Sequence, residues 1–299
     1  MKKLSFWVIF VLLAVGFQGC SSKKYFKPDE LTKNTHSIEK IGADIVHIHS
    51  YGATLGDQRF IYKEGLSSEY LEPGYRFLNK NNQTYLSTND EGSLAITDHN
   101  QTQKISFDSN IVAATIENSL IALSFVDNSI VLYDIEEEKV VFKEYLSVSI
   151  LNDIRITNPI FLTTLVLFPT LDGKIVIVDK GKKTIYRTIN IDPQNEVRNI
   201  IYLAAIDDSL VAATPNKIFS FINGKVNILD LEIKNVVADG KHIFVSTLDG
   251  RVIKYDQNLN QLQMKKFKFA KFHAMVYTCL LYTSPSPRDR TRSRMPSSA

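Results

Sequence analysis

A short strand-like unit, closed at both ends by turn residues, recurs along the chain and limits its fold more than any other feature. Clear copies span 92–98, 128–134, 173–179 and 250–256, and weaker copies span 58–62 and 216–222. Successive copies end 34 to 45 residues apart, a period typical of a four-stranded propeller blade. A two-sheet sandwich is the alternative, but one repeated period argues against it.

Apolar runs accompany these units on both sides. One run precedes a unit at 119–125, 161–168, 209–213 and 242–247, and another follows at 139–145, 184–189 and 261–269. The sequence therefore predicts an all-β chain, a propeller over residues 39–278 with about five or six blades of a seven- or eight-bladed ring. In such an incomplete ring, the strand near residues 44–50 lacks a closing partner.

Glycine and aspartate recur at fixed places in these units. The repeated turn residues are Gly92, Asp98, Asp134, Gly173, Asp179, Gly250 and Asp256. Four aspartates could indicate gathered catalytic carboxylates, but one per unit at the same place favours turn formation. No nucleophile elbow, phosphate-binding glycine loop or zinc signature accompanies them, so the sequence indicates a protein that is not an enzyme.

The units resemble the repeats of the pyrroloquinoline-quinone-like propeller superfamily. Residues 171–179 and 248–256 fit the first half of that repeat, Leu-Asp-Gly followed by alternating apolar residues and Asp. The tryptophan of the second half is replaced by Phe142, Tyr186 or Met264, so other apolar residues must dock blade against blade. Without that tryptophan and calcium ligands, the resemblance does not imply a quinone-dependent dehydrogenase, and no cofactor is expected.

The first nineteen residues indicate export. Lys2 and Lys3 precede an apolar run from Phe6 to Phe17, which is too short for a typical membrane span and sits where a secretory signal would. Cys20 follows Gly19, which resembles the bacterial lipoprotein signal and implies lipidation of Cys20. An ordinary signal peptide or an uncleaved anchor is the alternative. The polar residues 20–38 then form a tether, and Ser after the cysteine implies an outer-membrane lipoprotein facing the periplasm.

The last residues break with the rest of the chain. Residues 279–299 are rich in Arg, Ser and Pro and resemble a translated sequencing adapter, so we exclude them from the fold. A natural basic tail is the alternative. Outside this segment and the first nineteen residues, 29 basic and 31 acidic side chains remain, a net charge of about −2. That balance excludes a strongly basic nucleic-acid binder.

Histidines are the remaining candidates for chemistry. His47 and His49 lie two apart in an expected strand, so their side chains share a face and could hold a metal. Two structural strand histidines are the favoured interpretation, since no cysteine or assigned acid accompanies them. Asn100 matches an extended bacterial N-glycosylation acceptor, which matters only if the organism has that pathway.

A lipoprotein signal followed by such repeats resembles outer-membrane protein assembly factors of the BamB type. The resemblance implies a non-enzymatic, lipid-anchored scaffold whose partners are envelope proteins, among them the barrel assembly machinery. The first alternative is a periplasmic accessory protein of a respiratory redox enzyme system. The second, less favoured alternative is a propeller enzyme. The resemblance carries no partner-binding residue over to this sequence.

Overall fold

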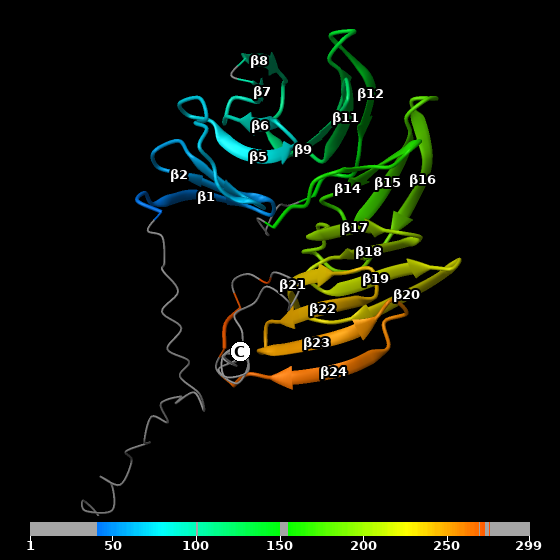
Figure 1. The fold of residues 1–299 in the computed structure, drawn as a ribbon. Helices are drawn as coiled ribbons and strands as arrows, with labels where there is room; N and C mark the ends of the chain where they lie inside the picture. The colour runs from blue at the N-terminus through cyan, green and yellow to red at the C-terminus, as the bar shows by residue number, and fades with distance from the viewer. Residues whose placement is uncertain (1–40, 100, 150–154, 269, 273–274, 276–299) are drawn as a thin grey trace, which may run out of the picture. The chain divides into compact units, whose positions relative to one another are not determined.

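The computed structural model describes residues 41–99, 101–149, 155–268, 270–272 and 275, and every regular element in them is a β-strand. These residues belong to one of the chain's two compact units, which begins at Ile41. The strands form six sheets of four strands each, and Figure 1 shows how these sheets follow one another along the chain. In this part of the chain, no helix is long and apolar enough to cross a membrane.

Each sheet is a run of consecutive antiparallel strands. The first sheet contains β1 (Ile45–His49), β2 (Gly52–Leu55), β3 (Phe60–Tyr62) and β4 (Gly65–Leu66). The second contains β5 (Arg76–Asn81), β6 (Thr84–Thr88), β7 (Ser93–Asp98) and β8 (Gln101–Ser106). The third contains β9 (Ile111–Glu117), β10 (Leu120–Phe125), β11 (Ser129–Asp134) and β12 (Lys139–Tyr145).

The other three sheets repeat this order. The fourth contains β13 (Ile160–Phe161), β14 (Leu165–Pro169), β15 (Lys174–Asp179) and β16 (Thr184–Asn190). The fifth contains β17 (Tyr202–Ile206), β18 (Ser209–Ala213), β19 (Lys217–Ile222) and β20 (Lys225–Asp230). The sixth contains β21 (Ile233–Ala238), β22 (His242–Thr247), β23 (Arg251–Asp256) and β24 (Gln261–Lys266).

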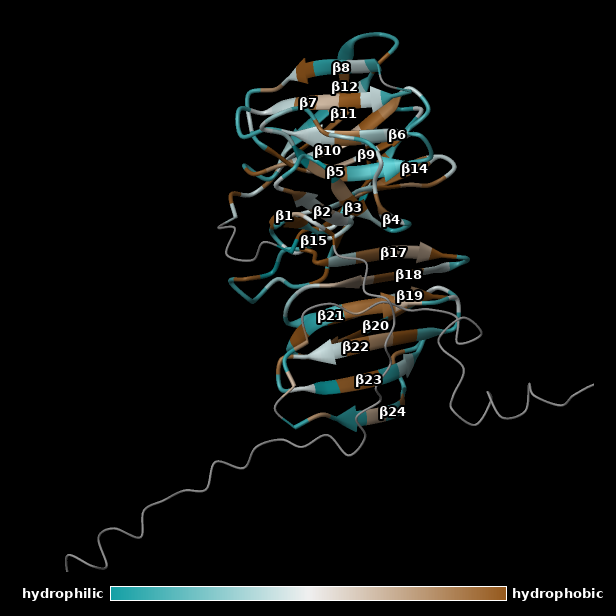
Figure 2. Cartoon of the chain, turned by 60° about the vertical axis from the view of Figure 1, so that its left-hand side comes forward, coloured by the Kyte–Doolittle hydropathy of each residue, from teal (hydrophilic) through white to brown (hydrophobic). Residues whose placement is uncertain are grey.

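Apolar side chains hold each sheet against the next. Successive residues of a strand point to opposite faces, so on β10 Ile121 packs toward the second sheet and Ala122 toward the fourth. One apolar cluster fills each of the five junctions between successive sheets. Figure 2 shows hydrophobic colour within strands such as β19 and hydrophilic colour in many of the turns. The prediction of an all-β propeller with four-stranded blades is confirmed.

Two details differ from the sequence-based expectation. The run 161–168 is not one strand, because a turn separates the end of β13 at Phe161 from the start of β14 at Leu165. Among the residues expected to replace the docking tryptophan, Phe142 packs into the junction of the third and fourth sheets. Tyr186 and Met264 are 68% and 51% exposed, so other apolar residues dock these blades. Their outer strands, β16 and β24, face solvent along most of their length.

The repeated glycine sits in a tight turn with a positive φ, and at Gly92 and Gly250 a side chain would collide with the backbone. Gly92 and Gly250 have φ of +78° and +85°, and an added Cβ would lie 2.5 Å and 2.6 Å from a backbone carbonyl. The third sheet has Asn128 at this place with φ of 63°, a conformation that asparagine tolerates. Its amide donates to the Ser147 carbonyl and its oxygen accepts from the Leu171 amide, 2.7 and 2.8 Å away. Asn128 thereby connects two successive sheets.

An aspartate precedes the glycine in the fourth and sixth sheets, with different burial. The Asp172 carboxylate is fully buried and pairs with Lys174, and it accepts from Thr170 Oγ1 at 2.6 Å. Burial opposes its ionisation most strongly, yet hydrogen bonds from Lys174, Thr170 and Asn128 leave the pKa of Asp172 below its usual value. Asp249 makes the equivalent contacts with Thr247 and Arg251 but is 39% exposed.

We therefore predict that Asp172→Ala destabilises the protein more than Asp249→Ala does. Removing Asp172 leaves buried donors without their acceptor, which costs about 2–4 kcal/mol in the free energy of unfolding. At Asp249, water replaces the lost contacts, so the loss is smaller. Urea denaturation of both variants measures the difference, and an equal loss for both would contradict the interpretation.

Candidate functional site

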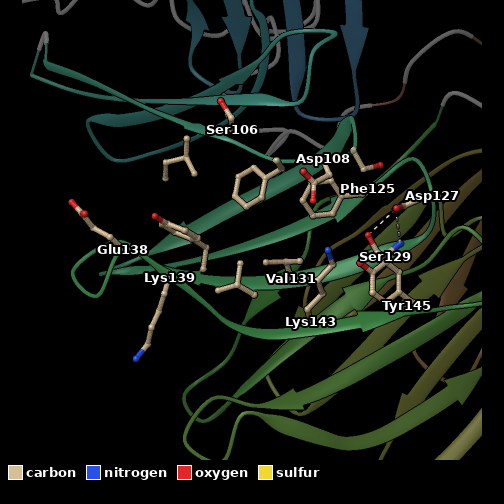
Figure 3. Close-up of a pocket in the computed structure, with 15 residues that line it drawn as sticks. Ser106, Asp108, Phe125, Asp127, Ser129, Val131, Glu138, Lys139, Lys143 and Tyr145 are labelled. Atoms are coloured by element: carbon tan, nitrogen blue, oxygen red, sulfur yellow. Dashed lines mark hydrogen bonds between the residues drawn. The ribbon is translucent and has the colours of Figure 1, made fainter.

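A groove of about 340 Å³ lies between the second and third sheets, on the side of their outer strands. It is formed by the end of β8, the segment that leads into β9, and the strands β11 and β12. Figure 3 shows these lining side chains, with those of Glu138 and Lys139 extending away from Phe125 and Val131. The groove is the principal candidate for a site of recognition in the described residues.

Aromatic and aliphatic side chains form the floor of the groove. Phe107 follows β8, and its ring lies 5.4 Å from the ring of Phe125 at 61° and 5.9 Å from the ring of Tyr133 at 82°. These edge-to-face arrangements are favourable for aromatic pairs. Phe125, Val131 and Tyr133 are 3%, 1% and 8% exposed, and burial raises the pKa of the Tyr133 hydroxyl. The floor can therefore receive an apolar or aromatic side chain.

Charged and polar residues line the rim. The Lys143 ammonium lies 4.7 Å from the centre of the Tyr145 ring. The hydrogen bond with the Tyr145 hydroxyl raises the pKa of Lys143, and the negative charges of the nearby Asp108 and Asp127 add a smaller effect in the same direction. The Asp127 carboxylate accepts from the backbone N–H and hydroxyl of Ser129 at 3.0 and 2.7 Å, bonds that Figure 3 draws as dashes. An apolar floor with a rim that carries both positive and negative side chains suits the binding of a protein segment better than catalysis on a small molecule.

A second notable feature is the bridging segment, residues 155–159, which precedes β13. Arg155 donates through Nη1 to the Ile233 and Lys234 carbonyls of the sixth sheet, at 2.9 and 2.6 Å. The Asn158 side chain accepts from the Ala114 N–H of the third sheet at 3.2 Å. Its amide also donates to a carbonyl of the second sheet, at 3.4 Å.

The first sheet joins this network through the turn between β1 and β2. The Tyr51 hydroxyl lies 3.3 Å from Thr157 Oγ1, and Ser50 Oγ donates to the Ile156 carbonyl. Burial raises the pKa of Tyr51. It also raises the pKa of Tyr202 to about 12, and the Tyr202 hydroxyl accepts a hydrogen bond from the Ala238 N–H at 3.0 Å. These polar groups fasten sheets to one another, which is a structural role.

His49 belongs to the same network and is held neutral. Its Nε2 lies 3.2 Å from the Val112 carbonyl and its Nδ1 accepts from the Tyr51 N–H at 3.4 Å, so the proton sits on Nε2. Burial lowers the pKa of His49 to about 4, with Arg76 adding to the effect and the Val112 carbonyl opposing it. His47 lies beside it on β1 and is exposed. Among the described residues, no group of three histidines, cysteines or acids could hold a metal.

The turn aspartates do not gather at one site. Asp134 Oδ1 accepts from the backbone N–H groups of Glu136 and Glu137. Asp179 Oδ1 likewise accepts from the backbone N–H groups two and three residues further along the chain. Asp256 accepts from the Asn258 and Asn260 amides, and Asp98 pairs with His99. Each carboxylate therefore serves its own turn. Cys20, Asn100, residues 1–38 and 279–299 lie outside the described residues.

The sequence analysis identified neither the groove nor the bridging segment as a unit. Phe107 stands outside the repeated unit, and the groove forms only when β8 and β12 of different sheets come together. Arg155 binds backbone carbonyls, which any residue type supplies. The one hint in the sequence is Arg155, the single arginine of the long connection 146–159.

Comparison with known proteins supports the propeller architecture. No family model matches the chain. It is 26% identical over 318 residues to plasminogen-binding protein PgbB of Helicobacter pylori strain J99, a match that covers 90% of this chain and 59% of PgbB. PgbB of strain 26695 is also 26% identical, over 308 residues, with coverage of 87% and 57%. The chain thus spans less than two thirds of the curated relatives it matches.

Solved structures share the fold at low sequence identity. BamB from Moraxella catarrhalis has a TM-score of 0.61 and 16% identity, covering 76% of each chain. The computationally designed Ika8 protein has a TM-score of 0.56 and 14% identity, covering 72% of this chain and 70% of its own. The C-terminal WD40 domain of Sif2 has a TM-score of 0.55 and 13% identity, covering 76% of this chain and 74% of its own. These likenesses establish the β-propeller fold and nothing about activity.

The neutral state of His49 predicts a stability that falls in acid. Because its pKa is about 4 in the folded protein and about 6.5 when unfolded, the unfolded state binds the extra proton first. The contribution of neutral His49 to the free energy of unfolding is fully present above pH 6.5 and is lost as the pH falls toward 4. The loss is about 2–3 kcal/mol between pH 7.5 and 4.5.

Urea denaturation of His49→Gln at both pH values tests this. Glutamine keeps a donor for the Val112 carbonyl and does not titrate, so the variant should lose less stability than the unsubstituted protein over this interval. His47→Gln is the matched control and should behave like the unsubstituted protein. A pH dependence unchanged in His49→Gln would show that other groups cause it.

Proposed function

We propose that this protein is a non-enzymatic, lipid-anchored scaffold of the cell envelope that binds other envelope proteins, with a role in outer-membrane protein assembly. The groove between the second and third sheets carries the proposal, because its apolar floor and charged rim fit a protein segment. The propeller fold shared with BamB is consistent with it. Lipidation at Cys20 would hold the propeller at a membrane and raise its local concentration near a partner.

The groove also suggests how such a partner binds. A side chain of the partner would enter between Phe107, Phe125 and Val131, while Lys143 and Asp127 pair with charges beside it. Aromatic anchors in desolvated hollows supply most of the binding energy at protein interfaces. Tyr145 is 67% exposed at the rim and would cover the inserted side chain.

Tyr145 has a matched control in the next sheet. Tyr186 of β16 is 68% exposed, as Tyr145 of β12 is 67% exposed, but Tyr186 does not line the groove. We expect the full-length protein, purified from membranes in mild detergent, to carry a barrel-assembly component. Tyr145→Ala should lower the recovery of that component about fivefold or more, and Tyr186→Ala should leave it unchanged.

Two results would contradict the proposal. Absence of every barrel-assembly component from the unsubstituted sample removes the assembly role. Equal recovery with Tyr145→Ala and Tyr186→Ala removes the groove as its site.

Plasminogen binding is a second candidate, favoured by the curated relatives alone. If this chain shares that property, immobilised plasminogen should retain the purified protein at concentrations at which serum albumin does not. Comparing Tyr145→Ala with Tyr186→Ala in the same assay shows whether the groove takes part. Retention no greater than on albumin would reject this candidate.

A further inference from the structure

The outer strand of the sixth sheet is exposed along its whole length. β24 lies at one end of the strand order, where Figure 1 draws it at the margin of the sheet, and all six of its residues are exposed. Two apolar side chains of this strand, Leu262 and Met264, are 49% and 51% exposed, and Phe267 directly after it is 38% exposed. Exposed apolar side chains that stand among charged ones indicate a surface that contacts another molecule or a membrane.

Lysines accompany these apolar side chains and form a surface that we name the basic edge: Lys254, Lys265, Lys266 and Lys268. Lys254 pairs with Gln263, and Val252 pairs with Lys265, so the two lysines are diagonal neighbours on one face of the sheet. The Lys265 ammonium also lies 5.3 Å from the centre of the Phe267 ring. The basic edge therefore places cations directly beside apolar groups.

Among the described residues, a single carboxylate pairs with the basic edge. Asp249 Oδ2 lies 3.3 Å from Lys266 Nζ, while its Oδ1 accepts from Arg251 Nε at 2.9 Å. In the same part of the chain, no ion pair involves Lys254, Lys265 or Lys268. Three ammonium groups are therefore available to an anionic ligand.

The charges of the chain are distributed unevenly in the same sense. Residues 41–149, which contain the first three sheets, carry 16 acidic and 7 basic side chains, a net charge of −9. Residues 155–272, which contain the last three, carry 11 acidic and 17 basic side chains, a net charge of +6. An anionic surface therefore attracts the later sheets and repels the earlier ones, and this asymmetry orients the protein as it approaches.

The chemistry of the basic edge fits a lipid surface better than a protein carboxylate. Protein interfaces favour arginine, whose planar guanidinium binds a carboxylate with two hydrogen bonds, and they are depleted of lysine. The basic edge contains lysine only, and Arg251 beside it is engaged by Asp249. Long lysine stems lie along apolar surface while their ammonium groups remain in water, and anionic headgroups attract each ammonium group. Leu262 and Met264 supply apolar groups of the kind that enter the headgroup region.

We infer that the basic edge binds the phosphate-bearing surface of an anionic lipid membrane, with Leu262, Met264 and Phe267 entering between the headgroups. The inference rests on the proposed function, since a lipid anchor would hold the propeller beside a membrane. The contact would turn the acidic second and third sheets, and with them the groove, away from the bilayer, where a partner can reach it. An acidic protein segment on the basic edge is the competing occupant.

Lysine modification in the reconstituted protein tests the inference. The full-length protein is placed on vesicles of phosphatidylcholine and on vesicles of phosphatidylcholine with an equal part of phosphatidylglycerol. Its lysines are methylated reductively, which keeps their charge, and the modified peptides are quantified by mass spectrometry. We expect Lys265 and Lys268 to react at least about threefold more slowly on the anionic vesicles, because bound ammonium groups are shielded. Lys182 and Lys225, exposed beside the turns that lead into β16 and β20, are the controls and should react equally fast on both.

Two double substitutions test whether the lysines cause the contact. Lys265→Gln combined with Lys268→Gln should remove the protection of Lys266 on anionic vesicles, since half of the basic edge has lost its charge. Lys182→Gln combined with Lys225→Gln removes the same charge elsewhere and should leave that protection unchanged. Both variants keep the arginine-rich residues 279–299, so a contribution of that segment is the same in each.

Three results would overturn the inference: equal rates at Lys265 and Lys268 on the two kinds of vesicle, equal protection of Lys182 and Lys225, or protection by dissolved polyglutamate as strong as that by anionic vesicles. The last result would make an acidic protein segment the occupant. Association with phosphatidylcholine vesicles depends on the lipid anchor instead, so its absence counts against the proposed function and not against the basic edge.

Discussion

Apolar packing between the faces of successive sheets is the interaction on which the rest of the structure depends. A sheet in the middle of the series must bury both faces, so its inner strands carry apolar residues almost without interruption. In β11 five of six residues are buried, whereas β12 beside it is half-buried or exposed. Burial therefore falls from the inner strands to the outer ones, and surface chemistry is confined to outer strands, turns and connections.

The groove follows from this gradient. Phe107 leaves the end of β8 and turns inward between two sheets, where it meets Phe125 and Tyr133. A hollow of about 340 Å³ remains at the outer part of this junction, lined by residues of β8, β11 and β12. The polar rim keeps this hollow from becoming a purely apolar patch.

Local patterns predicted the strands because burial on a pleated sheet is periodic, and each turn needs a residue such as Gly92 or Asp179. They could not predict which outer residues would be covered. Phe142 pairs with Leu132 and packs against the next sheet, whereas Tyr186 falls at a register irregularity and Met264 pairs with Ile253, and both are exposed. The contacts of Arg155 were equally hidden, because they depend on carbonyls 78 and 79 residues away. Such contacts are set by the arrangement of sheets rather than by local sequence.

The bridging segment changes how this repeat protein behaves as a whole. A series of repeats that touch only their neighbours can unfold from either end, one unit at a time. Here Arg155 binds the sixth sheet, Asn158 the second and third, and Thr157 the first. Opening the sixth sheet alone therefore breaks bonds made by the connection before the fourth. Loss of either end is coupled to the middle of the series, which makes unfolding more cooperative and resists the fraying that would expose unpaired strand edges.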